Sequence, residues 1–321
     1  MQILDFTTAH IEQAVQIALQ NYEEERGFVP ALPLIDKWPD LNRFAENNLG
    51  VAAFDGGELI GFLCGHGVWE NAWGIQGLRN VFSPMHANGA IPENRAKIYA
   101  RMYQAAGEKW VRAGAVSHAV CLYAHDKEAQ EQFFRYGFGL RCVDAIRGMD
   151  EINLPSCDGY SFNELMPDNF LEVLPLEKML CRHMLNSPTF MVKSPMDINE
   201  FFTEERFLKN IAGARYFVAR KGDAVVAFLC AEVTGETFIC DLPGYIHLNG
   251  AFCLPEYRGK GVLQGLLSYT AETLKNDGFT KLGTDFESIN PAAYGFWLKY
   301  FTAYSHGLVR RIDESIMGVS K

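Results

Sequence analysis

The stretch that decides the fold is Pro255-Glu-Tyr-Arg-Gly-Lys-Gly-Val-Leu263. It follows an apolar run over 245–254, which predicts a strand, and it leads into 261–277, whose apolar spacing predicts a helix. The first turn of a helix leaves backbone N–H groups free and carries positive partial charge. Glycines let the backbone approach a ligand closely, and Arg258 and Lys260 add full charges. The sequence therefore predicts a pyrophosphate-binding turn.

This turn is neither of two common phosphate loops. It lacks the Gly-Lys-Ser/Thr of a Walker loop and the G-x-G-x-x-G of a dinucleotide-binding fold. Taken alone, it could be an ordinary glycine turn with two solvated cations. The strand before it, the helix after it and the downstream run from Asn290 to Phe296-Trp297 favour anion binding.

Outward from the turn, the sequence repeats itself once. Phe62-Leu-Cys64 recurs as Phe228-Leu-Cys230, and Arg147-Gly-Met-Asp-Glu151 resembles Arg310-Arg-Ile-Asp-Glu314 163 residues later. The same offset of 163 pairs Arg95 with Arg258. We therefore predict two copies of one domain, 1–152 and 160–321, joined by a linker over 153–159 that contains Pro, Ser, Asp and Gly.

Each copy has the same predicted order of helix, antiparallel strands, strand, helix, strand, helix and strand, which makes a mixed α/β sheet. In the first copy these elements are 8–22, 50–54 with 59–64, 96–113, 116–123, 127–136 and 140–147. In the second copy the elements from the hairpin onward are 216–220 with 224–233, 245–254, 261–277, 280–286, 291–300 and 304–311.

In this setting the turn resembles the signature of the GNAT superfamily of acyl-CoA-dependent N-acyltransferases, Arg/Gln-x-x-Gly-x-Gly/Ala. Arg258-Gly-Lys-Gly-Val-Leu263 matches it except at Leu263, where the family has Gly or Ala. Pro255-Glu-Tyr257 and the aromatic-rich segment 290–300 are also typical of the family. The resemblance covers the second copy and implies two tandem GNAT-like domains. The first copy is degenerate, because Arg95-Ala-Lys-Ile98 has lost both glycines and should not bind the pyrophosphate.

The resemblance also implies acetyl-CoA as the cofactor and a role for each part of the site. The backbone of Ala251, Phe252 and Cys253 would bond the pantetheine arm, and Asn290 would contact the pantetheine or the adenosine end. The pyrophosphate would lie against the turn and the first helical residues, namely Arg258, Gly259, Lys260, Gly261, Val262, Leu263 and Gln264.

The candidate catalytic residues are His247, Glu287 and Tyr294. The acceptor amine must lose a proton, and His247, Glu287 or Asp285 could take it. The family often places a tyrosine seven residues after the conserved asparagine, to protonate the departing thiolate. Here that position is Trp297, so Tyr294 and Tyr300 are the nearby substitutes. Each of these residues could instead be structural.

Composition excludes several other classes of protein. The chain has 321 residues, with 29 Lys+Arg against 39 Asp+Glu, a formal net charge of −10. That balance disfavours nucleic-acid and polybasic membrane partners. The apolar run at 224–231 is too short to span a membrane, and the N-terminus has no signal-peptide pattern. The eight scattered cysteines predict reduced thiols in a cytoplasmic protein without a metal site.

The sequence thus predicts an N-acetyltransferase, a monomer or homodimer, that transfers an acetyl group from acetyl-CoA to a primary amine of a small molecule or peptide by direct attack. The methionine-rich segment 167–207 could line the acceptor pocket or simply pack a core. One alternative is a non-catalytic acyl-CoA-binding or regulatory protein, which Leu263 and Trp297 favour. Another is an aminoacyl transferase of tandem GNAT-like fold, which the acidic balance and the intact glycine turn disfavour.

Overall fold

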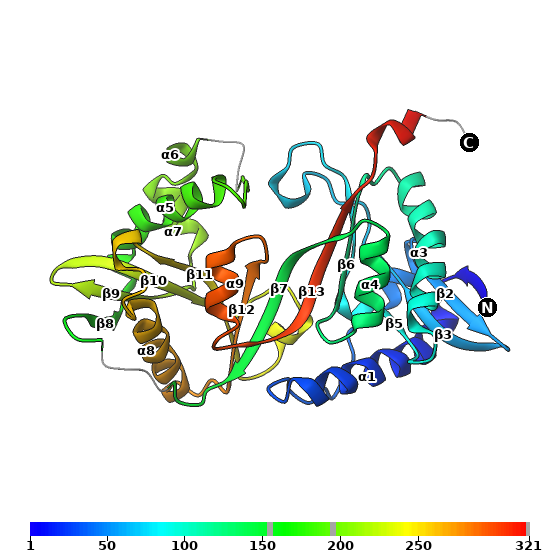
Figure 1. Ribbon diagram of the computed structural model, residues 1–321, viewed down its shortest axis with the longest axis horizontal. Helices are drawn as coiled ribbons and strands as arrows, with labels where there is room; N and C mark the ends of the chain where they lie inside the picture. Colours follow the sequence, from blue (N-terminus) through cyan, green and yellow to red (C-terminus); the bar gives the residue numbers. More distant parts are fainter. Residues whose placement is uncertain (153–156, 193–196, 319–321) are drawn as a thin grey trace. The chain divides into compact units, whose positions relative to one another are not determined.

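The computed structural model describes residues 1–152, 157–192 and 197–318. It forms two compact units (Figure 1). Unit 1 comprises Met1–Asp144 and Ala303–Lys321, and unit 2 comprises Ala145–Thr302. The C-terminal strand therefore packs with unit 1, whereas the repeat in the sequence assigns it to the second copy. Residues 153–156 of the predicted linker lie outside the described residues.

Unit 1 contains four α-helices and strands of two sheets among its described residues. The helices are α1 (Ile11–Phe28), α2 (Asn42–Glu46), α3 (Arg95–Arg112) and α4 (Lys127–Arg135). The first sheet has the antiparallel order β1-β2-β3-β5, with β1 (Gln2–Asp5), β2 (Val51–Asp55), β3 (Glu58–Leu63) and β5 (Asn88–Ala90). In the second, β6 (Ser117–Tyr123) lies between the parallel β4 (Asn80–Ser83) and the antiparallel β13 (Thr302–Arg311).

The core of unit 1 lies under α3. Ile98, Met102 and Ala106 recur every four residues and are buried against the sheets. Trp110 follows on the same face, fully buried, and its indole N–H donates to the Leu49 carbonyl (2.9 Å). Apolar periodicity in the sequence therefore predicts this helix almost residue for residue.

Unit 2 has one sheet of the order β12-β11-β10-β9-β8, in which only the β11–β12 pair is parallel. Its strands are β8 (Ser161–Glu164), β9 (Arg215–Lys221), β10 (Ala224–Glu232), β11 (Tyr245–Cys253) and β12 (Lys281–Glu287). Its helices are α5 (Leu174–Leu185), α6 (Ile198–Phe201), α7 (Glu204–Asn210), α8 (Val262–Asn276) and α9 (Pro291–Trp297). β7 (Gly139–Gly148) crosses the boundary between the units.

The order of elements bears out the internal repeat. β3 and β10 begin 166 residues apart, β6 and β12 164 apart, α4 and α9 164 apart, and β7 and β13 163 apart. The mixed α/β fold class is thus confirmed. The helix starts differ slightly from the sequence alignment: the residues that precede α3 and α8 are Asn94 and Gly261, 167 apart.

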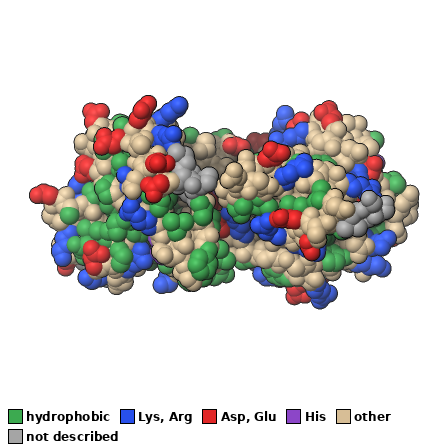
Figure 2. All heavy atoms as spheres, turned by 90° about the horizontal axis from the view of Figure 1, so that it is seen from above, with side chains coloured by type: hydrophobic (Ala, Val, Ile, Leu, Met, Phe, Trp, Pro, Cys, Tyr) green, Lys and Arg blue, Asp and Glu red, His purple; other side chains and the backbone are tan. Residues whose placement is uncertain are grey.

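No pattern in the sequence predicted β1, β4, β5 and β8, which have only three or four residues each. It also left α5, α6 and α7 unassigned inside the methionine-rich segment. The helix predicted over 291–300 ends at Trp297. In the part of the chain that the structure describes, no helix is long and apolar enough to cross a membrane. Figure 2 shows Lys and Arg side chains scattered among acidic and apolar ones on one face.

Candidate active site

The candidate site begins where the pairing between strands β11 and β12 ends. β11 pairs with β12 from Tyr245 to Leu248, opposite Lys281 to Thr284, and then runs on to Cys253 without a β12 partner in the described register. On the other side, β11 stays paired with β10 as far as Cys253, and the register shifts between Leu248 and Gly250. The extra residue at this β-bulge, Asn249, turns β11 away from β12. A strand edge is therefore open over 249–253.

The open edge carries backbone groups that can bind an extended ligand. The Leu254 N–H donates to the Val226 carbonyl of β10 (3.0 Å). Because backbone groups alternate along a strand, the groups of Ala251 and Cys253 point away from β10, and those of Phe252 point toward it. The prediction that 251–253 bond a ligand is therefore sharpened to Ala251 and Cys253.

The predicted glycine turn lies at the end of this strand. Gly259 and Gly261 both have left-handed φ, 72° and 82°, and Gly261 directly precedes the first turn of α8. A side chain would strain the backbone at either position. A Cβ at Gly259 would meet nothing within 4 Å, so it is this conformation that calls for glycine there. The turn aims the free N–H groups of a 15-residue helix at the open strand edge.

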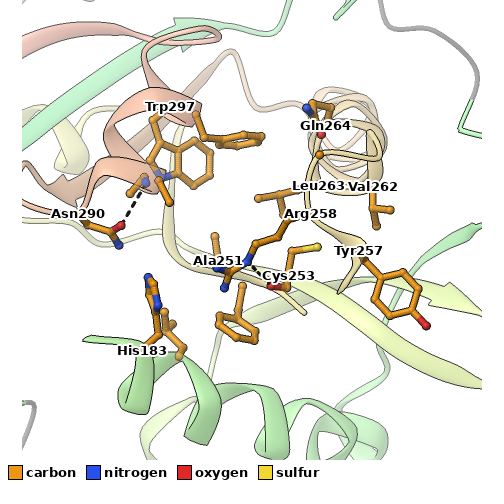
Figure 3. Close-up of a pocket in the computed structure, with 16 residues that line it drawn as sticks. His183, Ala251, Cys253, Tyr257, Arg258, Val262, Leu263, Gln264, Asn290 and Trp297 are labelled. Carbon is orange, nitrogen blue, oxygen red and sulfur yellow. Dashed lines mark hydrogen bonds between the residues drawn. The ribbon is translucent and has the colours of Figure 1, made fainter. Parts of the chain in front are cut away.

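A pocket of about 220 Å³ lies between this turn, β11 and α9 (Figure 3). It brings together most of the residues that the resemblance assigned to the cofactor: Ala251, Phe252, Cys253, Arg258, Gly259, Val262, Leu263, Gln264 and Asn290. Lys260 and Gly261 are in the adjoining turn, and the Lys260 ammonium lies 5.7 Å from the Tyr257 ring centre.

Arg258 is held against its own strand. Its Nε donates to the Cys253 carbonyl (2.9 Å), and its guanidinium lies 5.3 Å from the centre of the Phe252 ring. The side chain is otherwise exposed. The Arg258 guanidinium thus lines the pocket and has no carboxylate partner among the described residues. This charge can meet an anion from solution.

Asn290 caps α9 and forms the opposite wall. Its side-chain oxygen accepts from the Ala293 N–H (3.4 Å), and its amide nitrogen lies 3.7 Å from the Met184 sulfur. Trp297, on the last turn of α9, lines the pocket and is nearly buried. An indole has only a hydrogen-bond donor and no proton of useful acidity.

Comparison with known families agrees with this geometry. Residues 181–301 match the acetyltransferase (GNAT) family. Unit 2 carries a GNAT acetyltransferase domain. The protein is accordingly an acyltransferase, and the resemblance noted in the turn is confirmed. A search of curated proteins gave no match.

Solved structures extend the likeness to the whole chain. The GCN5-related N-acetyltransferase from Sphaerobacter thermophilus matches 97% of this chain and 95% of that one, with a TM-score of 0.57 and 12% identity. A GCN5-related glucosamine N-acetyltransferase region of a fungal multi-domain GH3 β-N-acetylglucosaminidase matches 96% of this chain and 38% of that one (TM-score 0.52, 15% identity). A tandem GNAT protein from the clavulanic acid pathway gives a TM-score of 0.44 at 12% identity, covering 100% and 99% of the two chains. At such identities the first two matches show a fold, here that of GCN5-related N-acetyltransferases.

The predicted base His247 lies in a buried polar cluster rather than in the pocket wall. It is 1% exposed, and its Nε2 donates to the Asp285 carboxylate (2.7 Å). Its Nδ1 lies 3.0 Å from the Tyr245 hydroxyl and 3.9 Å from the Cys240 sulfur. A Cβ at Gly283 would overlap the Tyr245 hydroxyl, so the glycine makes room for this cluster.

The cluster holds a proton on His247. Burial lowers the pKa of His247, but the hydrogen bonds and charges of Asp285 and Cys240 outweigh burial and raise the pKa to about 10. For Cys240, burial raises the pKa, and the hydrogen bond and charge of His247 bring the pKa below its ordinary value. Asp285 is the member that reaches solvent, with 26% of its side chain exposed.

The other two catalytic candidates do not line the pocket. Glu287 ends β12 and is half-buried. Tyr294 is 40% exposed, and its ring packs edge-on against Phe286 (5.9 Å). Tyr300 packs on Phe296 (5.3 Å).

Sequence reasoning missed the wall that α5 supplies. Leu180 and His183 line the pocket, and Met184 contacts Asn290. They come from the methionine-rich segment, whose composition was a weak signal for a pocket. Nothing in the sequence singled out His183.

In unit 1, the strand edge that corresponds to the open edge of β11 is closed by a side chain of the unit itself. Ala90 lies opposite Gly61 just as Cys253 lies opposite Ala227, so the two residues occupy matching positions. The Asn21 amide of α1 accepts from the Ala90 N–H (3.1 Å) and donates to the Ala90 carbonyl (2.9 Å). The strand edge that is open in unit 2 is therefore capped in unit 1.

Proposed function

We propose that the protein is an acetyl-CoA-dependent N-acetyltransferase that acts on a primary amine of a small molecule through the site in unit 2. The observation that carries this proposal is the open edge of β11 leading into the left-handed glycine turn of α8. Such an edge suits an extended chain of amide groups, and the helix start suits a pyrophosphate. Acetyl-CoA has both parts in this order.

The residues fit the cofactor in three places. The backbone of Ala251 and the N–H of Cys253, whose carbonyl already accepts from Arg258, would hydrogen-bond the pantetheine amides. The N–H groups at the start of α8, with Arg258 and Lys260, would hold the pyrophosphate, and Asn290 would contact the same ligand from α9. Bound acetyl-CoA supplies the acetyl group as an activated thioester.

The Asp285 carboxylate would take the proton of the acceptor amine, with protonated His247 holding that carboxylate in place. Asp285 directly follows Thr284, where β11 and β12 part, and it is the exposed member of the pair. Because the pKa of His247 is raised to about 10, its imidazole is already protonated at neutral pH and would position the carboxylate rather than take the proton itself. Glu287 remains an alternative base, and Tyr294 remains a candidate for the acid that returns a proton to the thiolate.

Direct attack by the amine is favoured over a covalent enzyme intermediate. Cys253 is the cysteine that lines the pocket among the described residues. Burial raises the pKa of its thiol to about 11, so at neutral pH it remains the poorly nucleophilic thiol.

Trp297 favours a second candidate function. It occupies the position where the family often has the proton-donating tyrosine, and it forms part of the pocket wall. A site with this residue could bind an acyl-CoA without turning it over.

Acetyl-CoA titration by calorimetry, followed by mass-spectrometric detection of acetylated amines across an amine panel, tests the proposal. We expect binding by wild type and at least one product. His247→Asn should lower kcat about 100-fold while the Kd for acetyl-CoA stays unchanged. Binding without any product would establish the non-catalytic alternative, and absence of binding would refute both functions.

A further inference from the structure

Unit 1 contains a cavity of about 300 Å³ next to the capped strand edge. One wall is a stripe of α1 with helical spacing, Asn21, Glu24, Glu25 and Phe28. The other walls are the residues before and at the start of α3, the end of β6 and the start of α4. The volume is at the lower end for small-molecule sites, which begin at about 300 Å³.

Tyr123 lines this cavity and carries a buried hydroxyl without a partner in the described residues. Tyr123, the last residue of β6, is 7% exposed, and its hydroxyl makes no hydrogen bond within the described part of the chain. A buried polar group left unpaired costs about 1–3 kcal/mol. Such a group lining a cavity large enough for a ligand indicates a missing hydrogen-bond partner.

The charges around the cavity are mainly acidic. Four carboxylates line it, Glu24, Glu25, Asp126 and Glu128, against the permanent cations Arg95 and Lys127. Burial raises the pKa of Glu25 and of Asp126, and contacts with His125 and Arg95, respectively, oppose this effect. These carboxylates would be stabilised by further positive charge.

The two cations are already engaged. Arg95 donates to the Ile91 carbonyl (3.3 Å) and to Glu24 (2.7 Å), and its third nitrogen lies 3.5 Å from Asp126. The Lys127 ammonium donates to the Ala124 carbonyl (3.1 Å). An anion entering the cavity would have to displace these bonds.

An aromatic surface completes the site. The Phe28 ring stacks on His125 at 4.7 Å with an interplanar angle of 5°, and Phe28 is largely exposed. A ring face attracts cations as well as other rings. We propose that this cavity binds a small organic ammonium compound, with its ammonium against the carboxylates and the Tyr123 hydroxyl and its carbon skeleton against Phe28. The proposal does not depend on the acetyltransferase assignment of unit 2.

The test is a titration of the 321-residue chain carrying ¹³C-methyl alanine, followed by NMR. In the chain, Ala124 lies between two residues that line the cavity, Tyr123 and His125, and Ala129 directly follows a third, Glu128. Ala292 and Ala293 line the pocket of unit 2 and report on that site separately. The probes are benzylamine and putrescine as ammonium compounds, benzyl alcohol as the neutral analogue and benzoate as the anion. We expect benzylamine to shift Ala124 and Ala129 saturably and at least tenfold more tightly than benzyl alcohol.

Matched variants identify the contacts. Tyr123→Phe removes only the unpartnered hydroxyl and should fold, and it should weaken benzylamine binding about fivefold. Glu128→Gln should weaken binding about threefold. Glu131→Gln, on the same helix but outside the cavity lining, should leave binding unchanged.

Three outcomes would overturn the proposal. The first is that neither amine shifts Ala124 or Ala129 at the highest soluble concentration. The second is that benzoate or benzyl alcohol binds as tightly as benzylamine. The third is that benzylamine binding is unchanged in both Tyr123→Phe and Glu128→Gln.

Discussion

The beginnings of α3 and α8 occupy the same place in two copies of one fold and have opposite surroundings. In unit 2, Gly261 precedes the helix, Arg258 is exposed, and the Cys253 edge is open. In unit 1, Asn94 takes the left-handed position, and Arg95 is held by Glu24 and Asp126. A fold that presents an anion site can thus be closed from within by two carboxylates and one amide.

The difference shows how one copy of a duplicated cleft can lose its binding site for an extended anionic ligand. Charges on α1 neutralise the cation at the helix start, and the Asn21 amide replaces the hydrogen bonds that an extended ligand would make. The remaining space in unit 1 is acidic, whereas the turn in unit 2 is basic. The following predictions test this contrast.

The largest effect is expected from Arg95→Met. Removal of this buried cation leaves Asp126, 8% exposed, without its compensating charge, and should lower the free energy of unfolding by about 3–5 kcal/mol. The matched Arg258→Met should cost less than about 1 kcal/mol, because Arg258 is exposed. It should instead weaken acetyl-CoA binding about tenfold.

Urea denaturation and calorimetry measure these two quantities on both variants. Equal losses of stability would contradict the contrast between a closed and an open site.

Acid should weaken unit 1 before unit 2. Burial lowers the pKa of four histidines in unit 1 to about 3 or 4, namely His66, His86, His118 and His306. The unfolded chain takes up these protons near pH 6.5 and the folded chain only near pH 4, so stability falls as the pH drops through this window. We expect a loss of about 2–3 kcal/mol for each of these histidines that the fold keeps neutral down to pH 4.5.

Hydrogen exchange read out by mass spectrometry at pH 7 and pH 4.5 locates the loss. In unit 2, His247 has a raised pKa, so its contribution is complete below about pH 6.5 and is lost only as the pH rises through about 10. Earlier loss of protection in β11 and β12 than in β6 and α3 would refute the prediction.

A smaller effect follows from exchanging one residue between equivalent strands. Gly283 of β12 matches Ala119 of β6, two residues into each strand. Gly283→Ala drives a methyl group into Tyr245 and should destabilise the protein by about 2 kcal/mol. The reverse change, Ala119→Gly, should cost only about 0.5–1 kcal/mol.

Thermal unfolding of the two variants gives the comparison. If both cost the same, the His247 cluster does not need the close approach of Tyr245.

The smallest effect is expected from Cys253→Ala, which gives unit 2 the residue that unit 1 has at Ala90. Because direct attack needs no thiol, kcat for acetyl transfer should stay within about twofold. A loss of 100-fold or more would indicate a covalent acyl-enzyme instead.

The sequence predicted those features that depend on local signals. Glycines at 259 and 261, the apolar stripe of α8 and the repeat offset were enough for the turn, the helix and the two copies. The predicted helix of α1 stopped at Tyr22 and left Glu24 and Glu25 unassigned. These residues close the cleft of unit 1 only because the fold brings the Arg95 guanidinium to Glu24 and the His125 ring to Glu25.

Features that depend on strand pairing could not be predicted. The open edge depends on a bulge at Asn249, which has no sequence signature. The final strand pairs with β6 of unit 1, and no local pattern distinguishes that partner from one in its own copy. His247 was identified as a candidate, but its cluster with Cys240 and Tyr245 depends on the loop before β11.

The most direct test of the account is thermal unfolding with and without acetyl-CoA, on wild type, Gly261→Glu and Gly222→Glu. Gly222 also has a left-handed φ, 59°, and lies in the β9–β10 turn, so it controls for backbone strain and added charge. At about 100 times Kd, the ligand should stabilise wild type and Gly222→Glu by about 2.7 kcal/mol, roughly 5–11 °C in Tm. Gly261→Glu should show no shift. Absence of a shift in wild type, or an undiminished shift in Gly261→Glu, would contradict the assignment of the open cleft of unit 2 as the acetyl-CoA site.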